Sequence, residues 1–208
     1  AELPLAPHWA RVLLASMEQR FGCASEMLSI VAMLQVTHPF VQPETAQTQL
    51  SARRFAAQQG DVYTLLNVYI AFQEAKGSAK WCSRHRLNFA ALSRAVNIRR
   101  QLERFLLRFA ASSPTLDPRS SALGKQNAAE RIAKCLITGL YANLARYDDA
   151  RMSYTLALTG KEVHVHPTSL LFNRRPDGGK VWVVYGEAVE SGQEGKVWIR
   201  DLCVLDEL

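Results

Sequence analysis

Apolar residues recur at helical spacing through the first two thirds of the chain. Repeats of three and four residues predict amphipathic helices over the ranges 8–21, 25–34, 44–58, 61–76, 88–109 and 125–146. Gly22 is predicted to end the first helix, and Ser25 and Asp61 are predicted to cap the second and the fourth. This part of the chain therefore predicts a bundle of helices.

After Arg146 the apolar spacing changes to a period of two, which predicts strands. The expected strands cover 152–158, 162–166, 180–189 and 196–205, with glycine-containing turns at 160–161, 177–179 and 192–195. Several short antiparallel strands in so short a segment are typical of a small barrel. The expected fold class is therefore α+β: an all-α helical bundle followed by a small antiparallel β-barrel.

A candidate boundary between the two parts lies at 112–123. This segment, SSPTLDPRSSAL, contains two prolines and four serines and has no apolar periodicity, so it is predicted to be a linker. The expected domains are a helical domain at 1–111 and a helix plus barrel at 124–208. We expect the helix at 125–146 to pack on the helical domain, so that the chain unfolds as one unit, and we expect proteases to cut the linker first.

Positive charge is concentrated in and before the helix at 88–109. From Lys80 to Arg108 there are eight Lys and Arg residues and one acidic residue, Glu103. The exposed arc of the helix is predicted to carry a row of polar and cationic side chains about one turn apart: Arg94, Asn97, Arg100, Gln101, Arg104 and Arg108. Such side chains bind phosphate, ribose or base edges, so all but Arg108 are candidate RNA contacts. The alternatives are a solvated basic face or a docking face for an acidic protein.

Arg99 is the exception on this helix, because it falls inside the apolar arc. A cation in that position needs a partner, since an unpaired buried charge is prohibitive. The partner is either an internal carboxylate, such as Asp61, or a bound ligand. Asp61 and Arg99 are therefore expected to have structural or coupling roles.

Composition narrows the classes of partner and of chemistry. The net charge of +6 and the pI near 9.3 favour an anionic partner. The four cysteines show no paired spacing, which argues against a zinc site or disulfide framework and favours a reducing compartment. No apolar run is long enough to span a bilayer, and no signal peptide is recognised. The start at Ala1 without a methionine suggests a fragment of a longer protein.

Several motifs resemble the helicase-associated region of the DEAH-box RNA helicases. They are Gly22-Cys23-Ala24-Ser25-Glu26, Gly60-Asp61, Thr64-Leu65-Leu66-Asn67-Val68-Tyr69, Trp81-Cys82 and Ile98-Arg99-x-Gln101-Leu102. Val62 stands where the family commonly has His, so a role of that His is absent here. The later motifs Asn143-x-Ala145-Arg146, Val165-His166-Pro167-Thr168-Ser169 and Trp182-Val183-x-Tyr185-x-Glu187 resemble the OB-fold of the same helicases. At 190–196 the family usually has a Thr-Thr-Lys-like strand, and this chain has a Gly-rich acidic turn.

The resemblance implies a C-terminal module that guides single-stranded RNA and transmits motion from motor domains that this chain lacks. The parent would use ATP and Mg²⁺ in RNA remodelling, such as splicing or ribosome assembly, in the nucleus, nucleolus or cytoplasm. Protein activators could dock on the OB-fold. On the barrel, the candidate RNA contacts are Arg146, Tyr154, His166 and Ser169. Tyr154 is the expected stacking residue, ahead of Trp81, Tyr185 and Trp198, and His166 is expected to shape a loop.

No catalytic residue or metal ligand is predicted within the chain. No GxxxxGKS or GxxxxGKT sequence is present to cradle a nucleotide phosphate, so no cofactor is expected in this fragment. His164-x-His166 places two imidazoles on one strand face but has no third ligand nearby. Asp148-Asp149 is predicted to be a solvated turn rather than a carboxylate dyad. We therefore expect the fragment alone not to be catalytic.

Overall fold

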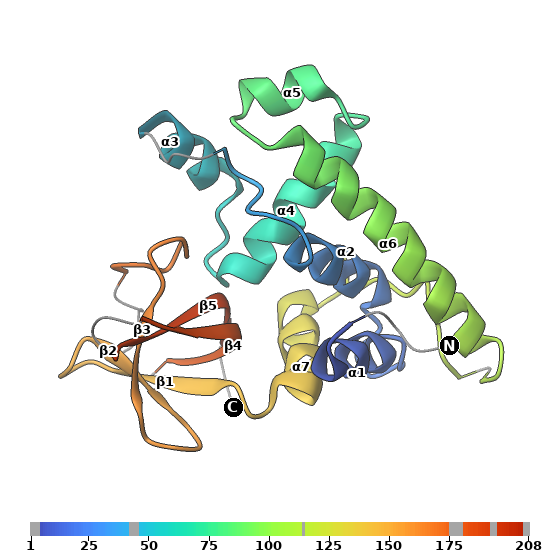
Figure 1. Cartoon of the computed structure of the whole chain (residues 1–208). Helices are drawn as coiled ribbons and strands as arrows, with labels where there is room; N and C mark the ends of the chain where they lie inside the picture. The colour runs from blue at the N-terminus through green and yellow to red at the C-terminus, as the bar shows by residue number, and fades with distance from the viewer. Residues whose placement is uncertain (1–4, 42–45, 114, 175–180, 192–194, 206–208) are drawn as a thin grey trace.

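A computed structural model describes residues 5–41, 46–113, 115–174, 181–191 and 195–205 of the chain. The helices are α1 (Pro7–Ser16), α2 (Ala24–Leu34), α3 (Ala46–Phe55), α4 (Asp61–Glu74), α5 (Ala79–Arg84), α6 (Phe89–Ala110) and α7 (Ala128–Leu140). The strands are β1 (Leu144–Asp148), β2 (Ser153–Leu156), β3 (Glu162–Val165), β4 (Trp182–Glu190) and β5 (Val197–Leu205). Helices are followed by a barrel, which confirms the expected fold class (Figure 1).

The expected helices are present, but two of their predicted caps are wrong. α2 begins after Cys23 and α4 begins after Gly60, and neither N-cap residue makes a side-chain capping hydrogen bond. Ser25 lies inside α2, and the carboxylate of Asp61 turns away from its own helix toward the barrel. The short helix α5 was not predicted, because its six residues are too few to show a helical period.

The expected helix at 125–146 is too long at its C-terminal end. α7 ends at Leu140, and the strand β1 begins at Leu144. Along β1, Ala145 and Tyr147 are buried in the barrel while Arg146 is exposed between them, which is the alternation of a strand. A strand this short adds only two apolar positions, so the sequence pattern merged it with the preceding helix.

The barrel is closed in the order β1-β2-β3-β5-β4. Four of its strand pairs are antiparallel, but β3 and β5 run parallel, with Val165 opposite Ile199. The expectation of a wholly antiparallel barrel is therefore wrong at this one pair. Because β5 lies between β3 and β4, these two strands follow each other in the chain but do not pair. The expected turns at 177–179 and 192–194 lie outside the described residues.

α7 packs against the N-terminal helix α1, which confirms that it packs on the helical domain. The contact is close at Gly139, where an added Cβ would lie 2.2 Å from the carbonyl oxygen of His8. Val12, Ile132 and Leu136 are fully buried in the same core, which also receives Val184 and Leu205 from the barrel. The helical domain and the barrel therefore share a continuous apolar contact.

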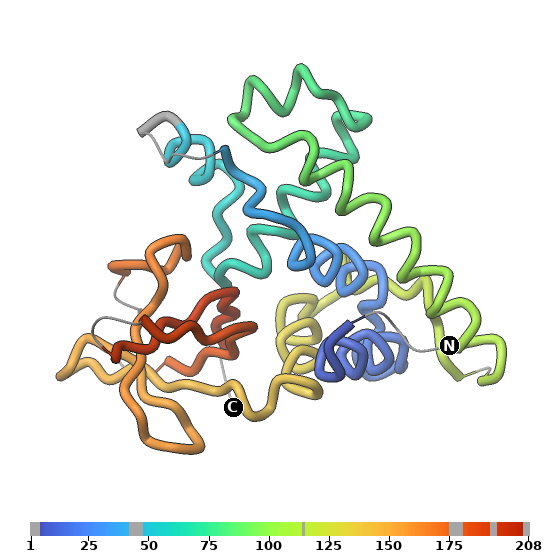
Figure 2. The backbone as a smooth tube through the Cα atoms, in the orientation of Figure 1, coloured from blue at the N-terminus to red at the C-terminus, as the bar shows by residue number. Residues whose placement is uncertain are grey.

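The segment at 112–123 has no helix or strand in its described residues, as expected, but its part from Asp117 to Leu123 is anchored by hydrogen bonds. The amide of Asp117 donates to the carbonyl oxygen of Met17 at 3.0 Å, and the amide of Ala122 donates to the buried carboxylate of Glu26 at 3.1 Å. Ala122 is fully buried. The trace returns from the end of α6 to the start of α7 along this path (Figure 2). This segment therefore holds α1 and α2 together, and the domain boundary there stays a prediction.

Candidate nucleic-acid interface

The long helix α6 has the two faces that its sequence predicts. Asn88 caps its start, with Oδ1 accepting from the amide of Ala91 at 3.1 Å. Leu92, Leu102 and Leu106 are buried against the helical core. The exposed face carries the predicted polar and cationic row, Arg94, Asn97, Arg100, Gln101 and Arg104, which we call the α6 stripe. Within the described part of the chain, no carboxylate pairs with an arginine of the α6 stripe, so its charge is available to an anionic partner.

Arg99 lies on the buried side of α6 and is paired, as expected. Its Nε donates to Ser29 Oγ at 3.0 Å and its Nη2 donates to Ser25 Oγ at 3.2 Å. Glu103, one turn further along the helix, lies 3.6 Å from its Nη1. The alternative pairing of Arg99 with Asp61 is wrong, because the carboxylate of Asp61 faces the barrel.

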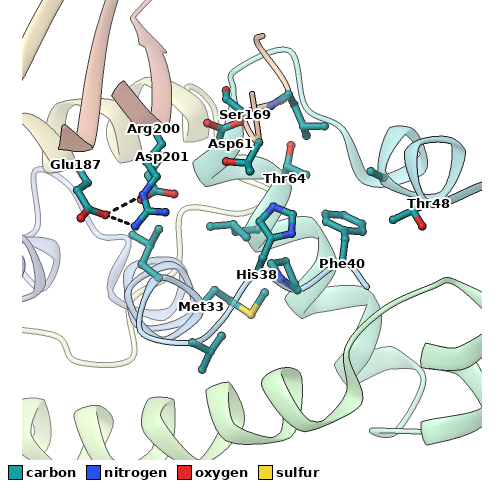
Figure 3. Close-up of a pocket in the computed structure, with 17 residues that line it drawn as sticks. Met33, His38, Phe40, Thr48, Asp61, Thr64, Ser169, Glu187, Arg200 and Asp201 are labelled. Atoms are coloured by element: carbon teal, nitrogen blue, oxygen red, sulfur yellow. Dashed lines mark hydrogen bonds and ion pairs between the residues drawn. The ribbon is translucent and has the colours of Figure 1, made fainter. Parts of the chain in front are cut away.

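Asp61 joins the helical domain to the barrel. Its carboxylate accepts hydrogen bonds from Ser169 Oγ at 2.9 Å, from the amide of Leu170 at 2.9 Å and from the amide of Leu202 at 3.1 Å. Figure 3 shows Asp61 and Ser169 side by side at this junction. Burial raises the pKa of Asp61, and the three hydrogen bonds oppose that rise. Ser169 was predicted to contact RNA, but its hydroxyl is buried and bonded within the protein.

The backbone at this junction requires a glycine. Gly60 has a φ of +110°, and an added Cβ would lie 2.5 Å from the carbonyl oxygen of Leu202. Gly60 forms a β-bridge with Cys203, and the amide of Val204 donates to the carbonyl oxygen of Gln59 at 2.8 Å. The start of α4 and the end of β5 are thus joined by backbone as well as side-chain hydrogen bonds.

The barrel has a pocket of about 510 Å³ beside β2 and β3. Aromatic and basic side chains form much of its lining, and we call them the barrel pocket residues: Tyr154, His164, Phe172, Arg174, Lys196 and Trp198. Met152, in the β1–β2 loop, and Lys196, just before β5, also line it. Strands 2 and 3, with the β1–β2 and β4–β5 loops, are where OB-folds bind oligonucleotides. Aromatic and cationic side chains together suit stacked bases and a phosphate backbone.

One of the predicted barrel residues, Tyr154, lines the barrel pocket, in a role that differs from the prediction. Tyr154 lines the pocket but is 4% exposed, with its ring edge against Tyr147. Burial, with a smaller effect of Tyr147, raises its pKa to about 12. Tyr154 is therefore part of the pocket wall and not an exposed stacking surface. The half-buried ring of Trp198 is better placed to stack, and it lies 5.7 Å from the ring of His164.

His166 shapes the loop that follows β3, as expected. Its Nδ1 lies 2.7 Å from Thr168 Oγ1 and accepts from the amide of Thr168 at 3.2 Å. Burial and the nearby charge of Arg200 lower the pKa of His166, so the ring stays neutral at neutral pH. Arg146 is exposed on β1, between Thr155 and Trp182 of the neighbouring strands, and does not line the barrel pocket.

The α6 stripe and the barrel pocket do not form one surface. α6 packs on α2, α2 packs on α4, and α4 packs on β5, so two helices separate α6 from the barrel (Figure 1). The sequence reasoning missed Phe172, Arg174 and Lys196. The available signal was the combination of aromatic and basic residues at 172–174 and 196–198. The segment 172–174 lies outside the expected strands, so no periodic pattern marked it, and the strand pattern at 196–205 does not show which side chains line a pocket.

The other candidate features of the sequence, a metal site, the cysteines and the Asp148-Asp149 pair, can also be placed among the described residues. They include no group of three or more His, Cys, Asp or Glu side chains that could hold a metal ion. All four cysteines are buried free thiols. Asp148 accepts from the amide of Ala150 at 3.0 Å, so it acts as a turn residue. Over the same residues, no helix combines the length and the apolar character that a membrane span requires.

Two protein-family models match the chain, one in each part. The model for the helicase associated domain (HA2), ratchet-like, matches residues 6–65. The model for the oligonucleotide/oligosaccharide-binding (OB)-fold matches residues 132–208. The first match covers α1 to the start of α4, and the second covers most of α7 and the barrel.

Similar proteins are RNA helicases. The probable ATP-dependent RNA helicase DHX35 of Homo sapiens is 35% identical over 208 residues, which cover 99% of this chain and 27% of the relative. Its Caenorhabditis elegans homologue is 35% identical, over 99% of this chain and 26% of the relative. The pre-mRNA-splicing factor ATP-dependent RNA helicase prp22 of Schizosaccharomyces pombe is 31% identical over 196 residues, 93% of this chain and 16% of the relative.

The chain thus spans about a quarter of the length of the DHX35 relatives that it matches. Similarity covers nearly the whole chain, and the order of the two matched domains is the order of the helices and the barrel in the fold. The chain therefore belongs to the DEAH-box RNA helicase family, as a ratchet-like helicase-associated domain joined to an OB-fold.

Proposed function

We propose that this chain guides single-stranded RNA within an ATP-dependent RNA helicase. The parent would remodel RNA or ribonucleoprotein, in splicing or ribosome assembly, and its motor domains would bind ATP and Mg²⁺. The names of the DHX35 and prp22 relatives support this assignment. Work in splicing or ribosome assembly would place the parent in the nucleus or nucleolus, and other RNA remodelling would place it in the cytoplasm.

The barrel pocket carries the proposal that this chain itself touches RNA. It lies beside β2 and β3, where the general OB-fold binds oligonucleotides, and Trp198 and Phe172 give it aromatic faces. Arg174 and Lys196 are exposed cations in its lining. A base stacked on Trp198 would leave its phosphate within reach of these side chains. This arrangement suits single strands, whose bases are free to stack.

The α6 stripe has two candidate partners. As an unpaired cationic row it suits RNA phosphates, which the sequence predicts. Its position on the side of the helical domain away from the barrel favours a second candidate, an acidic surface of another protein (Figure 1). Protein activators could also dock on the outer face of the OB-fold, and the motor domains of the parent are a further expected partner.

Fluorescence anisotropy with a labelled oligouridine strand tests the proposal on the 208-residue chain. Trp198→Ala should weaken binding by the loss of one stacked base, about 1–3 kcal/mol. Lys196→Ala should lower the slope of log affinity against log salt by about one unit. Lys125→Ala is the matched control, because Lys125 is exposed and lies outside the barrel pocket and the α6 stripe. Unchanged binding by both barrel variants would remove the barrel pocket from the RNA path.

A further inference from the structure

A second pocket lies at the junction between the helical domain and the barrel. It has a volume of about 170 Å³ and is lined by the end of α2, the segment 36–40, α3, α4 and the barrel (Figure 3). A cavity of about 150 Å³ is large enough to hold benzene. The junction pocket is therefore of a size to receive one ring or one long side chain.

The two sides of the junction pocket differ in chemistry. The helical side offers apolar surface from Met33, Phe40 and Leu65. The barrel side offers charged groups from Glu187, Arg200 and Asp201, as Figure 3 shows. An occupant that matches both sides must combine an apolar stem with a polar, hydrogen-bonding end.

The charges of the pocket favour a cation over an anion. The one arginine, Arg200, is already paired with Glu187, its Nε donating to Oε2 at 2.8 Å. Asp61 and Asp201 add two further carboxyl groups to the lining. Apart from Arg200, the basic side chain of the lining is His38. A phosphate would meet repulsion here, although the chain as a whole is basic.

Among the described residues of the pocket, Asp201 is the carboxylate without a hydrogen-bond donor, unlike Asp61 and Glu187. Among the described residues, none donates a hydrogen bond to its carboxylate, and its backbone φ is +59°, in the left-handed region. An added Cβ at Gly186 would lie 2.9 Å from the Cβ of Asp201, so a larger residue there would disturb it. Burial first, and then the charge of Asp61, raise the pKa of Asp201 to about 6. A cationic donor in the pocket would satisfy this carboxylate.

We propose that the junction pocket binds one arginine side chain from a segment of a partner protein. The aliphatic stem would pack on the helical side, against Met33, Phe40 and Leu65, and the guanidinium would reach the barrel side and donate to Asp201. Arginine fits better than lysine, because its planar group donates several hydrogen bonds at once and can bind a carboxylate through two of them. Since the pocket is built from both domains, such a partner would bind only while the helical domain and the barrel stay joined.

Nuclear magnetic resonance of the methionine methyl groups tests this proposal on the 208-residue chain. The probe is the peptide Gly-Arg-Gly with blocked ends, compared with peptides that carry citrulline or lysine instead of arginine. The methyl resonance of Met33 should shift on addition of the arginine peptide, while that of Met152, which is exposed on the barrel, should not. The citrulline peptide keeps the shape but not the charge, and it should bind at least about tenfold more weakly.

Asp201→Asn is the decisive variant, because Asn tolerates the left-handed backbone as Asp does. It should weaken arginine-peptide binding at least about tenfold and leave oligouridine binding unchanged. Glu74→Gln, which removes one exposed carboxylate from α4, is the matched control. It should bind the arginine peptide and oligouridine as tightly as the wild type does. Ala52→Leu, which narrows the pocket from α3, gives a second loss-of-binding variant that does not alter Asp201.

Three results would overturn the proposal. The first is an absent Met33 shift, and the second is equal binding of the arginine and citrulline peptides. The third is displacement of the arginine peptide by oligouridine, which would assign the pocket to RNA. Because the RNA test depends on Trp198 and this one depends on Asp201, failure of one proposal leaves the other intact.

Discussion

The hydroxyl of Ser169, in the loop after β3, donates a hydrogen bond of 2.9 Å to the carboxylate of Asp61, the first residue of α4. The two residues are 108 positions apart in the chain. With the amides of Leu170 and Leu202, this contact ties the helical domain to the barrel through one buried side chain. The arrangement makes Asp61 a structural residue of the domain junction.

Asp61→Ala should destabilise the whole chain. The substitution leaves the amides of Leu170 and Leu202 without acceptors, and each buried unsatisfied donor costs about 1–3 kcal/mol. The expected loss in the free energy of unfolding is therefore about 2–6 kcal/mol. Urea unfolding measures it, with Glu74→Ala on the exposed side of α4 as the control. A loss no larger than that of the control would show that the junction does not depend on Asp61.

The wild-type chain should unfold in a single thermal transition. α7 packs on α1, Val184 and Leu205 of the barrel enter the helical core, and segment 112–123 is hydrogen bonded to α1 and α2. These contacts couple the two domains, so one should not melt while the other stays folded. Calorimetry gives the measurement. Two well-separated transitions would contradict this expectation.

Arg99 and Arg94 should respond differently to truncation, although both are arginines of α6. Arg99→Ala removes hydrogen bonds to Ser25 and Ser29 on the buried side, so it should lower the free energy of unfolding by about 1–3 kcal/mol. Arg94→Ala removes an exposed side chain and should change it by no more than about 0.5 kcal/mol. Equal effects in urea unfolding would show that the facing of α6 is wrong.

The double variant Arg94→Ala with Arg100→Ala tests the α6 stripe directly. If RNA phosphates contact this face, the variant should fold normally and bind RNA of every sequence more weakly. Its slope of log affinity against log salt should fall by about one unit per lost contact. Salt-titrated anisotropy in the presence of the motor domains is the measurement. An unchanged salt slope would assign the α6 stripe to an acidic protein partner.

Asp201 predicts a pH dependence of stability with a defined sign. Its pKa is raised from 3.8 to about 6 in the folded protein, so folding favours its protonated form. The stabilisation is fully present below about pH 4 and is lost as pH rises through about 6, for a total of about 3 kcal/mol. Urea unfolding at a series of pH values across this range should show the free energy of unfolding of the wild type falling relative to that of Asp201→Asn. Parallel pH profiles would contradict it.

The facing of α6 could be predicted from the sequence because its 22 residues repeat the helical period several times. The position of Arg99 among apolar residues likewise predicted a paired cation, but not its partners, because the pattern carries no information on which helix faces it. Ser25 and Ser29 come from α2, 74 and 70 residues earlier. Glu103 was the partner that helical spacing alone could have identified.

The domain junction and the barrel pocket could not be predicted by periodicity. The local sequence predicts Asp61 as a helix cap because it precedes the apolar repeat of α4, and nothing local distinguishes a capping carboxylate from one that bonds to a loop 108 residues away. The barrel pocket joins β2, β3, the residues after β3 and the start of β5. Its composition becomes visible only when the closed barrel, with its one parallel strand pair, brings these segments together.

Cross-linking with single-stranded RNA that contains 4-thiouridine tests the central claim most directly. The photoactivated base reacts with side chains that it touches, and mass spectrometry then identifies the linked peptide. The account predicts cross-links to the segments that contain Phe172 and Trp198, and their loss when unlabelled oligouridine competes. Cross-links confined to helices of the helical domain, with none in the barrel, would contradict it.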